Sequence, residues 1–304
     1  MAAGRATSRC TPSRREPSFG RRPGIPGHVF GAGLGVPTTA PNEQLSDRRV
    51  RMAFVEYERD GAIGLVTLNR PERLNARSDA LESDLRQAWQ RFEADDDAKV
   101  AVLSGAGKSF CAGMDLKERP DRRSITGERL QSVAGTYDVT KPIVAAIHGY
   151  CLGGGLTLAM WADIRLAARS AVFGFPEIRH GIHPNTPYFV ANLIPVCVIA
   201  ELALTGENMT AQRAYEAGLI NRVVSDDSLM EEARAVAQRM ASFPLRVLRL
   251  GKQTLRKATE LPQEAWDLMG RNRRDTYASN DEAEGVAAFR EKRTPRWEPG
   301  TGER

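Results

Sequence analysis

An apolar run, Ile143–Ile147, is followed after a short loop by three consecutive glycines, Gly153-Gly154-Gly155, which open a segment of helical pattern. A short run that is apolar throughout is typical of a parallel strand buried on both faces. Glycine between a strand and a helix leaves the backbone amides uncovered, because it has no side chain. Unpaired N–H groups at a helix start favour negative charge. We therefore expect an anion site at the end of an interior strand.

Strands and helices alternate on both sides of this junction. Strands are expected at 53–58, 63–68, 100–103 and 164–168, and helices at 79–92 and 153–161. The first two strands flank Asp60-Gly61, a strong signal for a two-residue hairpin. Asp79 and Glu82 have the spacing of a helix start, and apolar residues follow them at intervals of three to four. This alternation indicates an α/β fold.

The pattern changes beyond Pro184, where helical periodicity dominates. Helices are expected at 196–204, 211–217, 229–240, 245–257 and 281–291. We therefore divide the chain into a leader at 1–51, an α/β core at 52–195 and a helical C-terminal region at 196–304.

The leader is rich in Gly, Pro, Ser and Arg and lacks hydrophobic periodicity, so disorder is expected there. It holds nine arginines against three acidic residues, an excess larger than the net charge of +5 of the whole chain. The basic charge therefore belongs to the leader, and we expect no nucleic-acid partner. The Arg-rich composition would also fit a mitochondrial transit peptide, and an over-extended start before Met52 is another alternative.

The composition of the whole chain is that of an ordinary globular protein, with 41% hydrophobic and 27% charged residues. No apolar run of about 18 residues occurs, so no membrane-spanning helix is expected. Cys10, Cys111, Cys151 and Cys197 are widely spaced, which is typical of free thiols in a reducing compartment. We expect a cytoplasmic protein without a metal site, or a mitochondrial one if the leader is a transit peptide.

A second glycine loop follows the strand expected at 100–103, in the segment Ser109-Phe110-Cys111-Ala112-Gly113-Met114-Asp115-Leu116. Two such loops side by side could aim two amides at one developing oxyanion, and each such donor contributes about 3–4 kcal/mol to a transition state. The alternative for the triple glycine is a tight strand-to-helix turn without a ligand. The glycines match neither the dinucleotide fingerprint nor a phosphate-binding P-loop.

Motifs spread over 54–292 resemble, in their order, those of the crotonase (enoyl-CoA hydratase/isomerase) superfamily. They are LNRP at 68–71 with NA at 75–76, FCAGMDL at 110–116, KPIVAAIHG at 141–149, GGG at 153–155, ADIR at 162–165, FGFPE at 173–177, LTG at 204–206, AGLIN at 217–221 and AFREK at 288–292. Each motif alone is weak, but the ordered set is very specific. The resemblance implies a crotonase-type ββα spiral core, a helical C-terminal trimerisation region, and a homotrimer or a dimer of trimers.

The resemblance also implies an acyl-CoA substrate, with coenzyme A as part of the substrate and no separate cofactor. The resemblance further implies that the backbone N–H groups of Met114 and Gly154 form the oxyanion hole. The residues implied for CoA binding, some of them reaching the nucleotide end in the same or a neighbouring subunit, are Arg73, Leu74, Ala76, Ala112, Phe289 and Lys292. For Lys292 the alternative is a solvated lysine on a helix face.

The acid–base residues depart from the family pattern. Hydratases of the family usually carry two glutamates facing the Cα–Cβ bond, and close carboxyl groups shift each other's pKa values. One is present as Glu177, but Thr157 occupies the position of the other. A threonine can hold a water molecule but cannot be its base at neutral pH. We expect Glu177 and Thr157 to be catalytic, whereas Asp115 and Asp163 look structural in the family.

The segment after the second glutamate position also departs from the pattern. The usual Pro-Gly-x-Gly-Gly-Thr is replaced by PNTPYF at 184–189. His183, Asn185 and Tyr188 thus lie close in sequence to the expected acyl pocket and could shape a distinct substrate. The alternatives are a helix-starting turn and a core tyrosine. His180 is expected at the surface.

Several reactions of the family fit a single glutamate. The favoured one is that of a lyase, an enoyl-CoA hydratase that adds water to a 2-enoyl-CoA through an enolate held by the two amides. The first alternative is a Δ3-Δ2-enoyl-CoA isomerase that uses Glu177 alone. Hydrolase, decarboxylase and carbon–carbon lyase reactions are further alternatives. A non-catalytic acyl-CoA-binding homologue is an alternative of another class.

Overall fold

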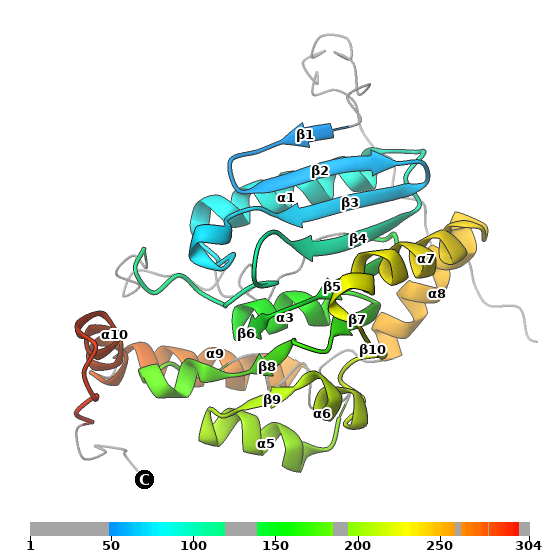
Figure 1. The fold of residues 1–304 in the computed structure, drawn as a ribbon. Helices are drawn as coiled ribbons and strands as arrows, with labels where there is room; N and C mark the ends of the chain where they lie inside the picture. The colour runs from blue at the N-terminus through cyan, green and yellow to red at the C-terminus, as the bar shows by residue number, and fades with distance from the viewer. Residues whose placement is uncertain (1–48, 119–138, 185–193, 259–262, 279, 298–304) are drawn as a thin grey trace, which may run out of the picture. The chain divides into compact units, whose positions relative to one another are not determined.

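The computed structural model describes residues 49–118, 139–184, 194–258, 263–278 and 280–297 (Figure 1). The chain divides into two units, 1–43 and 44–304, and all described residues belong to the second. The predicted leader up to residue 48 and the predicted acyl-pocket residues Asn185 and Tyr188 lie outside the described residues.

A seven-stranded sheet runs through this unit in the strand order β1-β2-β3-β4-β5-β7-β10 (Figure 1). Its strands are β1 (Arg49–Arg51), β2 (Val55–Asp60), β3 (Ile63–Leu68), β4 (Val100–Gly105), β5 (Ile143–Ile147), β7 (Ile164–Ala168) and β10 (Arg222–Val224). The first three strands pair antiparallel, and the pairing is parallel from β3 to β10. This confirms the predicted α/β class.

The sheet begins inside the predicted leader. β1 pairs with β2, and Val50 lies opposite Tyr57. Arg49 and Arg51 reach the Glu56 carboxylate at 2.9 and 3.2 Å. The leader boundary predicted at residue 51 is therefore corrected to lie before Arg49, because the arginines that marked these residues as leader take part in cross-strand ion pairs.

The hairpin between β2 and β3 has the predicted two-residue turn. Asp60 lies opposite Ile63, and Gly61 has a φ of +60°, a conformation that favours glycine. β3, β5 and β7 have the bounds that the sequence predicted, whereas β2 starts two residues later and β4 extends two residues further.

Two helices cover opposite faces of the sheet: α1 (Asp79–Ala94) lies behind it and α7 (Leu229–Ala241) in front of it in Figure 1. On β5, Ala145 packs in the apolar cluster that includes α1, whereas Val144 and Ala146 pack in the cluster that includes α7. Consecutive side chains of a strand point to opposite faces. β5 is therefore buried on both, which explains its unbroken apolar sequence.

α1 begins with a different cap from the predicted one. Ser78 is the N-cap residue, and its hydroxyl accepts a hydrogen bond from the Leu81 N–H at 3.2 Å. Asp79 and Glu82, the predicted starting pair, lie in the first turn instead, where their negative charge suits the helix dipole.

A second, three-stranded sheet leads into the triple glycine. Its strands, in spatial order, are β6 (Tyr150–Leu152), β8 (Val172–Gly174) and β9 (Asn208–Thr210), and α3 (Gly154–Met160) follows β6. These strands were not predicted, since three residues are too few to show a periodicity. The Gly153 N–H donates to the Gly174 carbonyl at 2.9 Å, which ties the triple glycine to this sheet.

The region after residue 195 is mostly helical, as predicted. Its helices are α5 (Val196–Thr205), α6 (Ala211–Glu216), α7, α8 (Leu245–Ala258), α9 (Gln263–Ala278) and α10 (Asp281–Glu291), of which α9 was not predicted. This region also supplies β9, β10 and the helix α7 that covers the main sheet, so the core extends beyond the boundary predicted at 195. Among the described helices, none is both long and apolar enough to cross a membrane.

α10 packs against η3 (Pro176–His180), the 3₁₀ helix that carries Glu177. A Cβ added to Gly285 would lie 2.1 Å from the His180 carbonyl oxygen, and one added to Gly181 would lie 2.3 Å from the Asp281 carbonyl oxygen. The two backbones approach so closely only because both residues are glycine. The last helix therefore supports the element that holds the predicted proton carrier.

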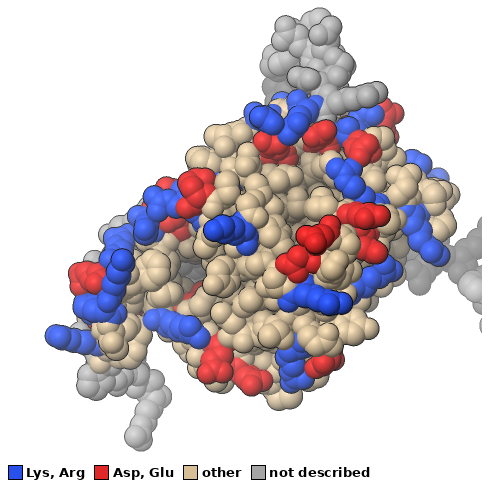
Figure 2. All heavy atoms as spheres, in the orientation of Figure 1, with Lys and Arg blue, Asp and Glu red and all other residues tan. Residues whose placement is uncertain are grey.

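Charges of both signs are mixed over the surface of the described residues. Figure 2 shows acidic and basic side chains side by side on one face, with Lys and Arg gathered on its left side, around α10. The sequence 290–296, at the end of α10 and just beyond it, contains four basic residues: Arg290, Lys292, Arg293 and Arg296.

Candidate active site

The two glycine loops lie against each other. Gly113 (φ +95°) and Gly153 (φ +50°) both have backbone conformations that favour glycine. A Cβ added to Gly113 would lie 2.9 Å from the Leu152 carbonyl oxygen and 3.6 Å from the Gly154 nitrogen. The loop that carries Met114 and the start of α3 are therefore in direct contact.

Local hydrogen bonding leaves the amides of Met114 and Gly154 without partners. The Arg77 N–H donates to the Gly113 carbonyl at 2.7 Å, and the Asp115 N–H donates to the Arg77 carbonyl at 3.0 Å, so this bridge skips the Met114 N–H. Gly154 begins α3, where an N–H has no acceptor within the helix. Within the described parts of the chain neither N–H has a hydrogen-bond partner, and both residues are half-buried.

Glu177 packs on the same glycine loop. A Cβ added to Gly153 would lie 2.5 Å from Glu177 Oε1 and 3.3 Å from Oε2. Oε2 is buried and has no hydrogen-bond partner among the described residues. Burial raises the pKa of Glu177 to about 7, although a hydrogen bond from its own backbone opposes the shift. A carboxyl group with this pKa can accept and return a proton near neutral pH.

Thr157 lies in the first turn of α3, four residues after Gly153. Its side chain is buried, and its hydroxyl donates to the Gly153 carbonyl at 3.3 Å. Gly153 is also the residue on which the Glu177 carboxyl group packs. The structure thus brings the two predicted catalytic residues to one glycine.

Four residues predicted to bind CoA come from two loops that are hydrogen bonded to each other. The Ala112 N–H donates to the Leu74 carbonyl at 3.0 Å, and the Ala76 N–H donates to the Arg73 carbonyl at 3.0 Å. Leu74 has a left-handed conformation with φ 51°, which turns the chain sharply at this point. Arg73 is exposed, whereas Ala76 is buried, so the loop has one face in solvent and one in the core.

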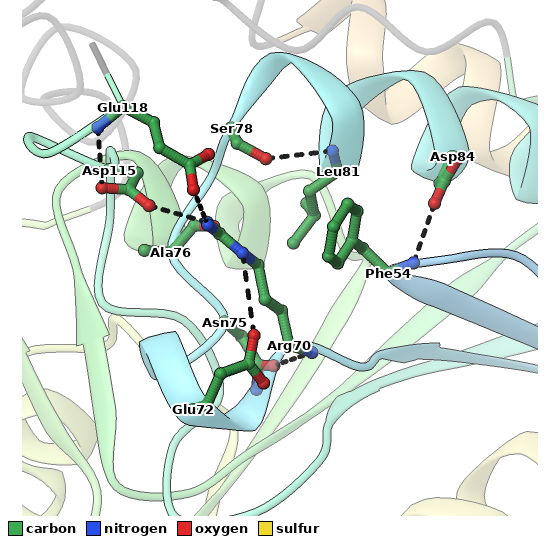
Figure 3. Close-up of polar contacts among 10 residues, drawn as sticks. All are labelled: Phe54, Arg70, Glu72, Asn75, Ala76, Ser78, Leu81, Asp84, Asp115 and Glu118. Atoms are coloured by element: carbon green, nitrogen blue, oxygen red, sulfur yellow. Dashed lines mark hydrogen bonds and ion pairs between the residues drawn. The ribbon is translucent and has the colours of Figure 1, made fainter.

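A buried ion pair holds the Met114 loop (Figure 3). The guanidinium of Arg70 donates to Asp115 at 2.7 Å, to the Ala76 carbonyl at 3.1 Å, and to Glu118. Burial by itself would raise the pKa of Asp115, but hydrogen bonds from the Lys117 N–H and from Arg70 outweigh it and lower that pKa. Asp115 is therefore a paired carboxylate that fixes the loop next to Met114.

Asp163 lies away from the glycine loops. It accepts a hydrogen bond from the N–H of Ile143, the first residue of β5, at 2.7 Å, and forms an ion pair with buried Lys252 at 2.8 Å. The triple glycine lies beyond the other end of β5. Asp163 thus joins the start of this strand to α8.

Phe289 and Lys292 lie at the end of α10. Phe289 is partly exposed, and its ring meets that of His180 edge-to-face at 5.1 Å between centroids. Contrary to the prediction, His180 is half-buried, because α10 covers it. Lys292 is exposed and ends the helix in a left-handed conformation. Arg290 donates to the Leu116 carbonyl at 3.0 Å, which brings this end of α10 to the Met114 loop of the same chain.

His183 lines a hollow of about 600 Å³ beside η3. Its lining is mostly apolar and comes from η3, α5 and the C-terminal segment: Ile178, Gly181, Ile182, Pro184, Ala203, Leu204, Thr276, Asp281 and Trp297. Ile178 follows Glu177 directly in the chain, so the hollow and the carboxyl group share one element. Asn185 and Tyr188 lie outside the described residues.

Arg77 was not predicted as a site residue, yet it contacts both glycine loops. Its guanidinium donates to the Gly154 carbonyl at 2.7 Å and to Glu82, and its backbone bridges to Gly113 and Asp115. Only its place directly after the NA motif could have drawn attention to it in the sequence. The structure groups no three His, Cys, Asp or Glu side chains for a metal ion among the residues it describes.

Comparisons with known proteins point to one family. The enoyl-CoA hydratase/isomerase family profile matches residues 58–300. A probable mitochondrial enoyl-CoA hydratase of Dictyostelium discoideum is 39% identical over 246 residues, which cover 79% of this chain and 89% of the relative. The (E)-benzylidenesuccinyl-CoA hydratase of Thauera aromatica is 34% identical over 258 residues, covering 79% and 97%.

A solved structure shows the same fold. The crystal structure of carnitinyl-CoA hydratase from Mycobacterium avium superposes with a TM-score of 0.73 at 33% identity, covering 81% of this chain and 99% of that one. The described strands and helices therefore form the crotonase-type fold implied by the motifs. The chain belongs to the enoyl-CoA hydratase/isomerase (crotonase) superfamily.

Proposed function

We propose that the protein is an enoyl-CoA hydratase, which adds water to a 2-enoyl-CoA. The observation that carries this proposal is the position of the Glu177 carboxyl group, with a pKa of about 7, on the glycine next to the free Gly154 N–H. The names of the D. discoideum, T. aromatica and M. avium relatives all describe hydration of an acyl-CoA, which supports it.

In the proposed reaction the thioester oxygen accepts hydrogen bonds from the N–H groups of Met114 and Gly154. Water held near Thr157 gives a proton to Glu177 as its oxygen bonds to Cβ, and the electron pair of the double bond moves onto the thioester oxygen as an enolate. Glu177 then returns the proton to Cα, and the carbonyl re-forms. One molecule of water is added to the substrate, and Glu177 returns to its ionised form.

The two amides supply most of the stabilisation in this scheme. Donors fixed by the fold need no reorganisation when the enolate forms, and each contributes about 3–4 kcal/mol. The dipole of α3 acts in the same direction at Gly154. Proton transfer by a carboxyl group whose pKa is close to the working pH adds roughly 10²–10⁴-fold in rate.

A Δ3-Δ2-enoyl-CoA isomerase is the second candidate. It is favoured by the hydrogen bond of the Thr157 hydroxyl to the Gly153 carbonyl, since this bond uses the hydroxyl proton. Here Glu177 alone takes a proton from Cα and returns it at Cγ.

The proposal includes the binding of coenzyme A and assembly into trimers. The basic residues around α10 (Figure 2) would suit the phosphate groups of CoA. Among the described residues, all large apolar side chains that are exposed lie beyond residue 195 except Tyr150, which supports the C-terminal region as the subunit interface. The protein would act in the cytoplasm, or in mitochondria if the leader before Arg49 is a transit peptide, as the D. discoideum relative's name would suggest.

Purified protein tested with a panel of short, long and aromatic enoyl-CoAs separates these functions. A hydratase removes the absorbance of the conjugated thioester of crotonyl-CoA or of another 2-enoyl-CoA, and the 3-hydroxyacyl product is identified by mass. An isomerase instead creates that absorbance from a 3-enoyl-CoA. Binding of acyl-CoA without turnover of any of these substrates would contradict both and support a non-catalytic homologue.

A further inference from the structure

Arg77 is hydrogen bonded to both glycine loops at once. Through its main chain it holds the first loop, since its N–H donates to the Gly113 carbonyl at 2.7 Å and its carbonyl accepts from Asp115 at 3.0 Å. Through its side chain it holds the second, since Nη1 donates to the Gly154 carbonyl at 2.7 Å. The residue therefore connects two chain segments that are about forty positions apart.

These bonds act on the peptide groups that flank the free amides. The Gly113 carbonyl and the Met114 N–H belong to one planar peptide unit, so fixing the oxygen also fixes the direction of the N–H. The Gly154 carbonyl belongs to the residue whose own N–H is free. Holding one end of Gly154 limits the rotation of this glycine, which has no side chain to restrict it.

The guanidinium is itself held in place. Its Nε donates to Glu82 in the first turn of α1, and the Arg77 side chain is only 8% exposed. A Cβ added to Gly154 would lie 3.1 Å from Nη1 and 3.3 Å from Cδ of Arg77, so the arginine packs directly on the start of α3. A planar guanidinium can donate to two acceptors at fixed angles, which a lysine ammonium does not reproduce.

We infer that Arg77 is a positioning residue that sets the spacing and direction of the Met114 and Gly154 amides, with Glu82 as its support. The inference rests on the proposed function, because it assigns Arg77 a role in the oxyanion hole proposed there. Arg77 also places a positive charge near the developing enolate, where a low dielectric strengthens its effect.

Arg77→Met tests this role, since methionine fills similar space without a donor or a charge. We expect kcat to fall about 10–100-fold, somewhat less than for the loss of an oxyanion donor, while KM and the affinity for CoA change little. Arg86→Met is the matched control, because Arg86 is exposed on the same helix as Glu82. It should leave kcat unchanged.

A vibrational measurement reports the oxyanion hole without turnover. Butyryl-CoA labelled with ¹³C at the thioester carbonyl cannot be hydrated, and its carbonyl band should move to lower frequency on binding to the wild-type protein. The shift should be clearly smaller in Arg77→Met and intermediate in Arg77→Lys. A general loss of packing would not change this band selectively.

If Arg77→Met does not fold, Glu82→Gln serves in its place, because it removes only the carboxylate that holds the Arg77 guanidinium. We expect a fall in kcat of about 3–10-fold and a smaller band shift. The role of Arg77 would be overturned if Arg77→Met left both the carbonyl band and kcat unchanged. If Arg77→Met is unfolded, the same result in both Glu82→Gln and Arg77→Lys would overturn it. A wild-type protein that binds butyryl-CoA without any band shift would instead contradict the proposed function itself.

Discussion

The pKa of Glu177 follows from what surrounds its carboxyl group. One oxygen faces the Cα of Gly153, and the other is buried without a hydrogen-bond partner among the described residues. Desolvation favours the neutral acid, so the pKa rises from 4.5 to about 7. A second carboxylate nearby would add to such a shift, whereas Thr157 carries no charge.

The rate should therefore depend on pH around neutrality. Glu177 must be ionised to accept the proton of water, so kcat/KM for hydration should rise through an apparent pKa of about 7 and level off above it. Initial rates with crotonyl-CoA from pH 5.5 to 8.5 give this profile. A profile already level from about pH 5.5 would mean that burial does not raise this pKa.

Thr157 separates the two candidate reactions. Its hydroxyl donates to the carbonyl of Gly153, the glycine on which the Glu177 carboxyl group packs, but a hydroxyl cannot remove a proton from water at neutral pH. We expect it to hold the water molecule that Glu177 activates. Isomerisation requires no water.

Thr157→Val keeps the shape of the side chain and removes the hydroxyl. We expect hydration to fall about tenfold or more, since one hydrogen bond to the water is lost, while proton exchange at Cα changes little. Product formation and solvent deuterium uptake are measured on the same variant. Equal losses of both would show that Thr157 acts on the fold of α3 and not on the water.

At the scale of elements, the close contact between α10 and η3 determines where Glu177 lies. The backbones meet at Gly181 and Gly285, and the ring of His180 packs on Phe289. Because η3 is short, it has little internal hydrogen bonding to fix its position. The last helix of the chain therefore contributes to the site although Glu177 precedes it by about a hundred residues.

Gly285→Ala should separate α10 from η3. The new methyl group would lie 2.1 Å from the His180 carbonyl, and relieving this clash costs about 1–3 kcal/mol of unfolding free energy. Activity should fall as well, since η3 moves. Gly270→Ala in α9 is the control, because its added methyl group would make only an ordinary contact, at 3.5 Å with the Arg274 side chain. Urea unfolding that gives the same stability for both variants would contradict the contact.

Elements with a strong periodic signal could be predicted from the sequence, and those without one could not. β5 was predicted because it is apolar on both faces, and α7 because its buried apolar positions recur every four residues. β6, β8 and β9 have three residues each, and β1 has a basic composition that resembled a leader. Their pairing depends on distant partners, which periodicity does not reveal.

Likewise, some residues of the site could be predicted from the sequence and others could not. The positions of Met114, Gly154, Glu177 and Thr157 were indicated by motifs, and the structure brings all four to the two glycine loops. Arg77 carries no motif of its own, and its contact with Gly154 joins segments far apart in the chain. Long-range side-chain contacts of this kind become visible only in the folded structure.

For the whole molecule, the exposed apolar residues beyond 195 predict an assembly. Val196, Leu204, Val247 and Leu255 are each more than 60% exposed in the single chain. Burying such side chains between subunits is favourable by roughly 25 cal/mol per Å² of apolar area. Light scattering after size-exclusion chromatography should give the mass of three or six chains. A mass of one chain that persists at micromolar concentration would contradict this prediction.

Proton exchange at Cα of butyryl-CoA in deuterated buffer, followed by mass, tests the role of Glu177 most directly. The wild-type protein should catalyse the exchange, because Glu177 removes this proton while the two amides hold the enolate. Glu177→Gln should lose about 10²–10⁴-fold of the exchange rate, bind butyryl-CoA as before, and unfold no more easily at pH 8, since it removes a buried charge. Glu201→Gln, at an exposed position of α5, should behave as wild type. Exchange that continues at the wild-type rate in Glu177→Gln would contradict the role of Glu177 as the proton carrier.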